Sequence, residues 1–259
     1  MTRVVRALLI ANGAVFAVQL LFRLVPALTQ FAQQHLPGDS LETGFGLSIK
    51  YFRPWQFITC MFMHDPEGIF HILFNLLALW MLGKDVERKM RARPFLVLYA
   101  TSGVFAGLCH LSLAVFTSPA APVIGASGAV FGVLIAYALL FPDNRIWFIK
   151  ARYFVIGLVA FESLMLFTRS EGNVAHLAHI GGAGWGFLFF KGRPIWHRMS
   201  EKVQYQKRVR RAQKEMRDRR RVDEILDKIN REGIGSLTKQ EKNFLNRAGQ
   251  KNKKRGKKP

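Results

Sequence analysis

Residues 123–140 read VIGASGAVFGVLIAYALL, and residues 173–190 read NVAHLAHIGGAGWGFLFF. Both stretches are almost wholly apolar, yet the first contains Ser127 and the second contains His176 and His179. Apolar helical segments of about this length are typical of membrane spans, and polar side chains inside a membrane are costly. These polar residues therefore need a structural or functional reason.

Small residues in the two stretches are spaced for close helix packing. Glycines four residues apart lie on one face of a helix and let two membrane helices approach closely. Such an approach would bring the Ser127 hydroxyl within hydrogen-bond reach of the His179 imidazole. The glycines expected at this contact are Gly125, Gly128, Gly132, Gly182 and Gly186.

The chain contains further apolar segments besides these two. A hydrocarbon core roughly 30 Å thick needs about 20 mostly apolar helical residues, and six segments come near this length. They predict an all-α polytopic membrane protein with spans at residues 5–25, 69–83, 95–116, 123–141, 152–168 and 173–190.

Lys and Arg residues lie mainly on one side of these predicted spans. A group between Lys84 and Arg93 follows the second span, and another between Arg145 and Arg152 follows the fourth. Because short cytoplasmic loops hold the excess of positive charge, both termini are predicted to be cytoplasmic. The second, fourth and sixth spans then run from outside to inside.

The charge is also unevenly divided along the chain. Half of the residues are hydrophobic, yet the net charge is +21, and 24 of the 38 Lys and Arg residues lie from Lys191 onward. This division predicts a membrane domain at 1–190 and a basic cytoplasmic tail at 191–259. A helical hairpin is expected at about 222–247, where Thr238-x-x-Glu241 has the pattern of a capping box.

So basic a segment beneath a membrane most simply contacts anionic lipid headgroups. Nucleic-acid binding is the weaker alternative for the tail, because charge alone does not discriminate between these partners.

Four polar side chains share a shallow depth below the outer surface in this topology. His71 and Asn75 lie one helical turn apart on the second span, and Ser127 and His179 lie in the first turns of the fourth and sixth. Serine becomes a strong nucleophile when an adjacent base takes its proton, and histidine titrates near neutrality. His71, Asn75 and the Ser127 backbone N–H are candidate donors to an oxyanion.

Three sequence motifs resemble the signatures of rhomboid intramembrane serine proteases. They are His71-Ile-Leu-Phe-Asn75, the Gly-Ala-Ser-Gly run at 125–128, and Ala178-His179-x-x-Gly182-x-x-x-Gly186. They occur in the family's order, and the resemblance covers roughly residues 5–190. It implies a six-helix bundle, a Ser127–His179 dyad without a third acid, and cleavage of membrane-anchored substrates near the outer face. It also implies an oxyanion hole of His71, Asn75 and the Ser127 amide.

The resemblance extends to residues outside the motifs. Glu87 matches an acidic position that ties cytoplasmic elements together. Trp55-Gln56 stands where many rhomboids have Trp-Arg, so the contacts of that arginine need another source here.

The family also suggests how a substrate would reach the site. His176 is expected to line the substrate cavity, and Phe74 and Phe161 are expected on the spans between which the family admits substrates laterally. Lipid contact or core packing is an equally good interpretation for either Phe. Glu162 beside Phe161 has three open interpretations: it snorkels to the interface, pairs with a polar partner, or is protonated.

The predicted function is hydrolysis of peptide bonds in transmembrane protein substrates, in a multi-pass protein of the bacterial plasma (inner) membrane. No metal or cofactor is predicted. A metal site of His71, His176 and His179 is an alternative, but no acidic ligand pair or H-E-x-x-H motif accompanies them. The competing class is an inactive relative that binds or escorts membrane helices. A transporter fits less well, because the polar residues gather at one face.

Overall fold

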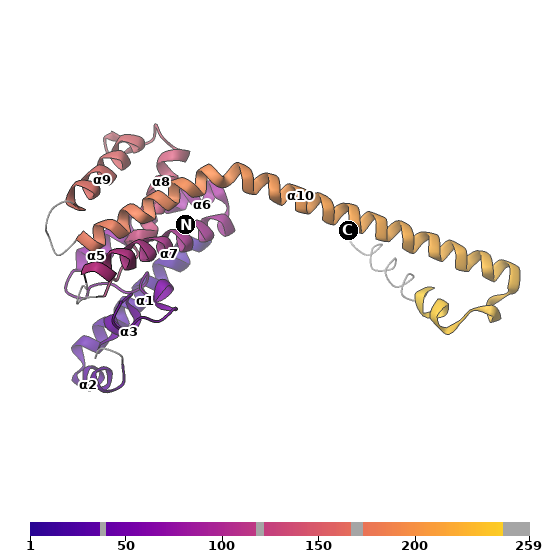
Figure 1. Cartoon of the computed structure of the whole chain (residues 1–259), viewed down its shortest axis with the longest axis horizontal. Coiled ribbons are helices and arrows are strands. Elements are labelled where there is room, and N and C mark those ends of the chain that lie inside the picture. The colour runs from indigo at the N-terminus through magenta and orange to yellow at the C-terminus, as the bar shows by residue number, and fades with distance from the viewer. Residues whose placement is uncertain (37–39, 118–121, 167–172, 246–259) are drawn as a thin grey trace. The chain divides into compact units, whose positions relative to one another are not determined.

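The computed structural model describes residues 1–36, 40–117, 122–166 and 173–245, and helices dominate it (Figure 1). The chain divides into two compact units, Met1–Gly192 and Arg193–Pro259, each described here by itself. The helical elements are α1 (Arg3–Leu24), α2 (Pro26–His35), α3 (Leu41–Phe45), α4 (Gln56–Thr59), α5 (Ile69–Ala78), the π-helical η2 (Leu79–Gly83), α6 (Lys84–Met90), α7 (Ala92–Thr117), α8 (Ser127–Leu140), α9 (Ala151–Leu166), α10 (Asn173–Glu232) and the 3₁₀ turn η3 (Ile234–Ser236). Between α8 and α9, β1 (Arg145–Ile146) pairs antiparallel with β2 (Ile149–Lys150).

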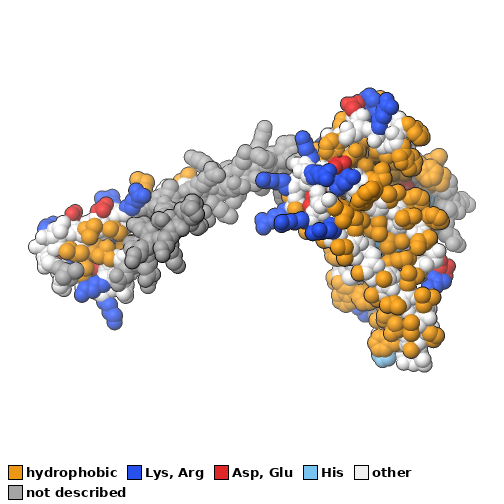
Figure 2. Space-filling model, turned by 180° about the vertical axis from the view of Figure 1, so that it is seen from behind, with side chains coloured by type: hydrophobic (Ala, Val, Ile, Leu, Met, Phe, Trp, Pro, Cys, Tyr) orange, Lys and Arg blue, Asp and Glu red, His pale blue; other side chains and the backbone are white. Residues whose placement is uncertain are grey.

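Several helices have the length and composition of membrane spans. Among the described residues these are Arg3–Leu24, Ile69–Met90 and Ala92–Leu113, and α8 is a shorter apolar helix. Figure 2 shows hydrophobic side chains over most of the visible face of the first unit, with Lys and Arg in separate clusters. Such a surface suits a lipid environment, in which backbone polar groups are satisfied inside each helix.

The second helical segment differs from its predicted bounds. It was expected at 69–83, but α5 continues through the π-helical turn of η2 into α6 and ends at Met90. Its last turns are polar, so hydropathy alone ends the segment too early. Arg91, with φ of 74°, breaks the helix before α7 begins.

The fourth segment also differs, and the difference matters for the site. A helix was expected from about residue 123, but α8 begins at Ser127. Residues 122–126 are instead held against the loop between α1 and α5, where Val123 and Leu47 exchange backbone hydrogen bonds of 2.8 and 2.9 Å. Gly125 has φ of +124°, which favours glycine and interrupts a helix. Ser127 is therefore the first residue of its helix, not the fifth.

The core of the first unit joins α1, η2, α6, α7 and α8. Buried Val5, Leu79, Val86, Phe95 and Tyr99 belong to one cluster of packed side chains. By contrast, most of the large hydrophobic side chains on α5 are exposed on the surface of the unit, as expected for a helix in contact with lipid.

Glu87 ties the start of α1 to α6 from a buried position. Its Oε1 accepts from the Val4 N–H at 3.1 Å and its Oε2 from the Val5 N–H at 2.9 Å. The first amides of a helix have no intrahelical acceptor, and a carboxylate there is also favoured by the helix dipole. Glu87 therefore connects α1 to α6, a tie that the resemblance implied.

The second unit contains the end of α10 and the turn that follows it. The helix expected to open a hairpin near residue 222 is the last part of α10, which ends at Glu232 before Gly233. The predicted capping box is confirmed. The Thr238 N–H donates to Glu241 Oε2 at 2.7 Å, and the Glu241 N–H donates to Thr238 Oγ1 at 3.2 Å. The hydrogen bonds that the Thr238 N–H and Oγ1 donate to the Glu241 carboxylate hold its pKa below its usual value. Helix follows at 239–245, and residues 246–247 of the predicted hairpin lie outside the described part.

Candidate active site

Ser127 stands at a backbone bend fixed by the long loop between α1 and α5. The Gly125 N–H donates to the Cys60 carbonyl at 2.9 Å, next to the Val123–Leu47 pairing. As the first residue of α8, Ser127 has one of the amides that lack an intrahelical acceptor. The bend thus presents both the Ser127 hydroxyl and its N–H at the helix end.

The predicted glycine contact brings α8 and α10 together through Gly128, Gly132, Gly182 and Gly186. Gly125 was also expected there, but it lies against His71 of α5. A Cβ on Gly182 would collide with the Gly128 carbonyl oxygen, and one on Gly186 would lie 2.8 Å from the Gly132 Cα. The two backbones are therefore closer than any side chain would permit. This approach places His179, on α10, beside Ser127.

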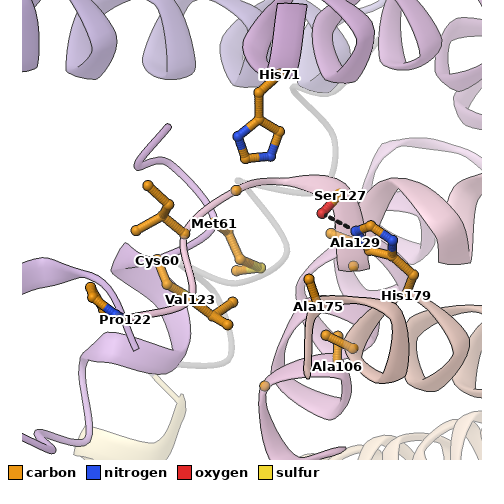
Figure 3. Close-up of a pocket in the computed structure, with 16 residues that line it drawn as sticks. Cys60, Met61, His71, Ala106, Pro122, Val123, Ser127, Ala129, Ala175 and His179 are labelled. Carbon is orange, nitrogen blue, oxygen red and sulfur yellow. Dashed lines mark hydrogen bonds between the residues drawn. The ribbon is translucent and has the colours of Figure 1, made fainter. Parts of the chain in front are cut away.

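The hydroxyl and imidazole are in direct contact. His179 Nε2 lies 2.7 Å from Ser127 Oγ, as the dashed line in Figure 3 marks. The Phe131 ring, one turn after Ser127, stacks on the His179 ring with centroids 4.6 Å apart and an interplanar angle of 11°. The stacking fixes the plane of the imidazole.

A carboxylate on α9, that of Glu162, contacts the other nitrogen of the His179 ring. Glu162 Oε2 lies 3.0 Å from His179 Nδ1 and 2.6 Å from His176 Nδ1. Of the three interpretations open for Glu162, the structure shows pairing with polar partners. The resemblance implied a Ser–His pair alone, so this carboxylate is an addition to it.

His71 faces the serine across a cavity of about 220 Å³ (Figure 3). A Cβ on Gly125 would lie 2.7 Å from His71 Nε2, so the ring rests directly over this glycine. Met61 and Cys60 form part of the opposite wall. Burial raises the pKa of the Cys60 thiol to about 12, so this cysteine stays protonated and is a poor nucleophile.

A second, larger hollow of about 530 Å³ opens between α5 and α9 and also reaches Ser127. Phe74 and Asn75 line it from α5, and Glu162 lines it from α9. The Asn75 amide donates one hydrogen bond to the His71 carbonyl at 2.9 Å. Phe161 was predicted beside Phe74 at this passage, but its half-exposed ring is not among the residues that line the hollow.

Two residues of the long loop have contacts that the sequence did not predict. Gln56 is fully buried, and its amide donates to the carbonyls of Thr43, Gly44 and Tyr51 at 3.1–3.3 Å. Its Oε1 accepts from the Arg53 N–H at 3.0 Å. Gln56 thus organises the loop at the position where many rhomboids have arginine. A buried amide has the donors and acceptor for this role, and no sequence spacing reveals it.

His64 is the other residue that was missed. It is fully buried, and its ring packs edge-on against His71 with centroids 5.3 Å apart. Its backbone N–H and C=O pair with the side-chain amide of Gln19 at 2.9 and 2.7 Å. Burial, reinforced by the charge of His71, lowers the pKa of His64 to about 4. The His64 imidazole is therefore uncharged at neutral pH, and it packs against the His71 ring.

The grouping of possible metal ligands differs from the one considered for the sequence. Within the described ranges, Glu162, His176 and His179 offer ligand atoms within 4.8 Å of one another, and His71 is not part of the group. Ligands about 2.0–2.2 Å from a tetrahedral zinc ion lie roughly 3.3 Å apart. The contacts of 2.6 and 3.0 Å are shorter and fit direct hydrogen bonds.

Fold and site together describe an integral membrane protein with a serine and a histidine in contact near a helix end. The Rhomboid domain family matches residues 51–192, so the chain belongs to the rhomboid family. A second family, of unknown function (DUF6576), matches residues 203–251.

Relatives of known name are similar over half or more of this chain. YdcA of Bacillus subtilis (strain 168) is 33% identical over 149 residues, which are 56% of this chain and 70% of YdcA. Rhomboid protease GluP of the same bacterium is 35% identical over 134 residues, 52% of this chain and 25% of GluP. RHOMBOID-like protein 1 of Arabidopsis thaliana is 29% identical over 207 residues, 71% of this chain and 51% of that protein.

Proposed function

We propose that the chain is an intramembrane serine endopeptidase that cleaves transmembrane protein substrates near the outer face of the bilayer. Residues 1–190 would form a six-helix membrane domain, and 191–259 a basic cytoplasmic tail. We place the protein in a bacterial plasma (inner) membrane with both termini in the cytoplasm. The observation that supports this best is the 2.7 Å contact of Ser127 Oγ with His179 Nε2 at the cavity wall.

The chemistry would begin with transfer of the serine proton. As Ser127 Oγ bonds to the scissile carbonyl carbon, its proton passes to His179 Nε2. His179 then gives this proton to the departing amide nitrogen as the C–N bond breaks. A water, activated by the same Nε2, hydrolyses the acyl-enzyme and restores the serine.

The oxyanion would lie in the cavity between α5 and the start of α8. The Ser127 N–H is oriented by the helix start, and the His71 ring faces the same space. Asn75 borders the adjoining hollow, one turn from His71. Donors aimed at developing charge in a site with little water stabilise the transition state more than the ground state.

A transmembrane substrate would reach Ser127 through the hollow between α5 and α9. Its apolar wall suits a membrane-embedded segment, and Phe74 lies along it. A peptide bond inside a helix is shielded, so the substrate must unwind locally, and the polar groups of the site could satisfy its freed backbone. Segments with helix-breaking residues near the outer boundary are therefore the preferred substrates.

The alternative function is that of a non-catalytic relative that binds or escorts membrane helices. Such a protein needs the apolar hollow but not a serine hydroxyl in hydrogen-bond contact with an imidazole nitrogen. The Ser127–His179 contact favours the enzyme.

The first test uses a serine-directed fluorophosphonate probe and a transmembrane substrate with purified protein in detergent. We expect labelling at Ser127, and loss of both labelling and cleavage in Ser127→Ala and in His179→Ala, with no effect of a chelator. Ser112→Ala is a matched control, because the Ser112 hydroxyl is exposed and bonds the Cys109 carbonyl of its own helix at 2.7 Å. Cleavage by folded Ser127→Ala protein would reject the proposal.

A further inference from the structure

Glu162 is a buried acid in an otherwise apolar helix. Glu162 is 7% exposed. It lies on α9 and lines the hollow that also reaches Ser127. A carboxylate in such surroundings is costly unless it is paired and hydrogen-bonded. Here one oxygen, Oε2, faces ring nitrogens of both His176 and His179.

The direction of these bonds follows from the chemistry of the groups. When Glu162 is ionised, its carboxylate can only accept, so His179 Nδ1 then holds the proton in their 3.0 Å contact. In a neutral imidazole the other nitrogen then has the free lone pair. That nitrogen is Nε2, which lies 2.7 Å from Ser127 Oγ. The serine hydroxyl therefore donates to His179, as proton transfer requires.

We propose that Glu162 is a positioning residue of the reaction, which holds His179 in the tautomer that can accept the serine proton and then stabilises the imidazolium that forms. This inference rests on the proposed function. It adds Glu162 to the expected pair of Ser127 and His179, so that three residues from α8, α10 and α9 are in successive contact. Glu162 does not touch the reacting atoms, and no proton moves to it.

His176 gives the carboxylate its own fixed position. Its Nδ1 donates to the same Oε2 at 2.6 Å, the shorter of the two bonds. His176 and His179 lie on one face of α10, three residues apart. A carboxylate held by His176 presents its oxygen to His179 without needing to reorganise during the reaction, and such preorganisation favours catalysis.

A purely structural role is the competing explanation, because Glu162 also joins α9 to α10. The two explanations differ in the behaviour of Glu162→Gln. Glutamine keeps the size and can still bond both helices, but it has no charge, and its amide can donate to Nδ1 and so favour the tautomer with the proton on Nε2. In a soluble triad the equivalent Asp→Asn change lowers kcat about 10⁴-fold while geometry is preserved.

The experiment compares Glu162→Gln, Glu162→Asp and the control Ser163→Ala in full-length protein. Ser163 is next to Glu162 on α9, and its hydroxyl bonds the Val159 carbonyl of its own helix at 2.8 Å. We expect Glu162→Gln to lower kcat about 10²–10⁴-fold with KM within a few-fold of wild type. Glu162→Asp should recover part of this loss, and Ser163→Ala should match wild type.

A spectroscopic measurement separates positioning from folding. The ¹⁵N shifts of the His179 ring should report a proton on Nδ1 in wild type and a shift toward the Nε2-protonated form in Glu162→Gln. Folded Glu162→Gln protein with wild-type kcat and an unchanged tautomer would overturn the inference. If instead wild-type protein neither reacts with the probe nor cleaves, the proposed function itself fails, so the two failures are distinguishable.

Discussion

At the scale of single residues, one oxygen of Glu162 on α9 contacts both His176 and His179 of α10. Ser127 and His179 were expected to meet from their depth and from the flanking glycines, and they do. The partners of Glu162 could not be predicted, because the face of α9 that points inward is set by tertiary packing and not by a periodic pattern. A snorkelling, a paired and a protonated glutamate look alike in sequence.

His64 gives a prediction for the pH dependence of stability. Its pKa is about 4 in the folded protein and 6.5 in the unfolded chain, so between these values the unfolded chain binds a proton that the folded protein does not. Stability is therefore full above about pH 6.5 and falls as pH decreases toward 4, by about 3 kcal/mol from this residue. We expect His64→Leu to flatten this part of the curve in melting experiments in detergent. An equally steep acid loss in the variant would show that other groups cause it.

At the scale of elements, apolar runs predicted where helices occur better than where they begin. The α8 start was missed because Val123 and Ile124 are as apolar as the helix that follows, while their extended backbone is fixed by pairing with Leu47. The end of α6 was missed for the opposite reason, since its last turn is polar but helical. A long-range contact with Leu47 sets the start of α8, whereas the backbone conformation of Arg91 ends α6.

Glu87 allows a prediction about how two such elements are joined. Hydrogen bonds to a charged group contribute about 1.5–3 kcal/mol each, and Glu87 accepts two from α1 in a buried position. Glu87→Ala should therefore lower the free energy of unfolding by roughly 3 kcal/mol, measured by denaturant titration in mixed micelles. Asp85→Asn is the control, because Asp85 pairs with the exposed Arg88 at 2.9 Å and should cost under about 1 kcal/mol. Equal effects of the two changes would argue against a capping role.

At the scale of the whole molecule, composition separated a hydrophobic part from a basic one without showing what the basic part does. All of the proposed chemistry lies before Gly192. We therefore expect a chain truncated after Gly192 to react with the serine probe at the wild-type rate in detergent. A folded but unreactive truncated protein would show that the tail helps to build the site.

The tail itself should respond to lipid charge. Lys and Arg near a membrane surface are each attracted to anionic lipid by about 1 kcal/mol, and salt screens this attraction. In nanodiscs, trypsin should cleave the tail of the full chain more slowly with anionic than with zwitterionic lipid. About 0.5 M salt should remove the difference. Cleavage that is independent of lipid charge would point to another partner for the tail.

The pairing of the long loop with the bend before Ser127 has a consequence for how such chains can change in length. Leu47 and Cys60 of the loop bond Val123 and Gly125, which are only two residues apart. Between Leu47 and Cys60, the Gln56 side chain bonds the backbone of Tyr51 and Arg53 and so fixes the path of the loop. Insertions or deletions between 48 and 59 would shift Leu47 relative to Cys60 and displace the serine. Length changes in the loop before Leu47 would leave the spacing of these two residues unchanged.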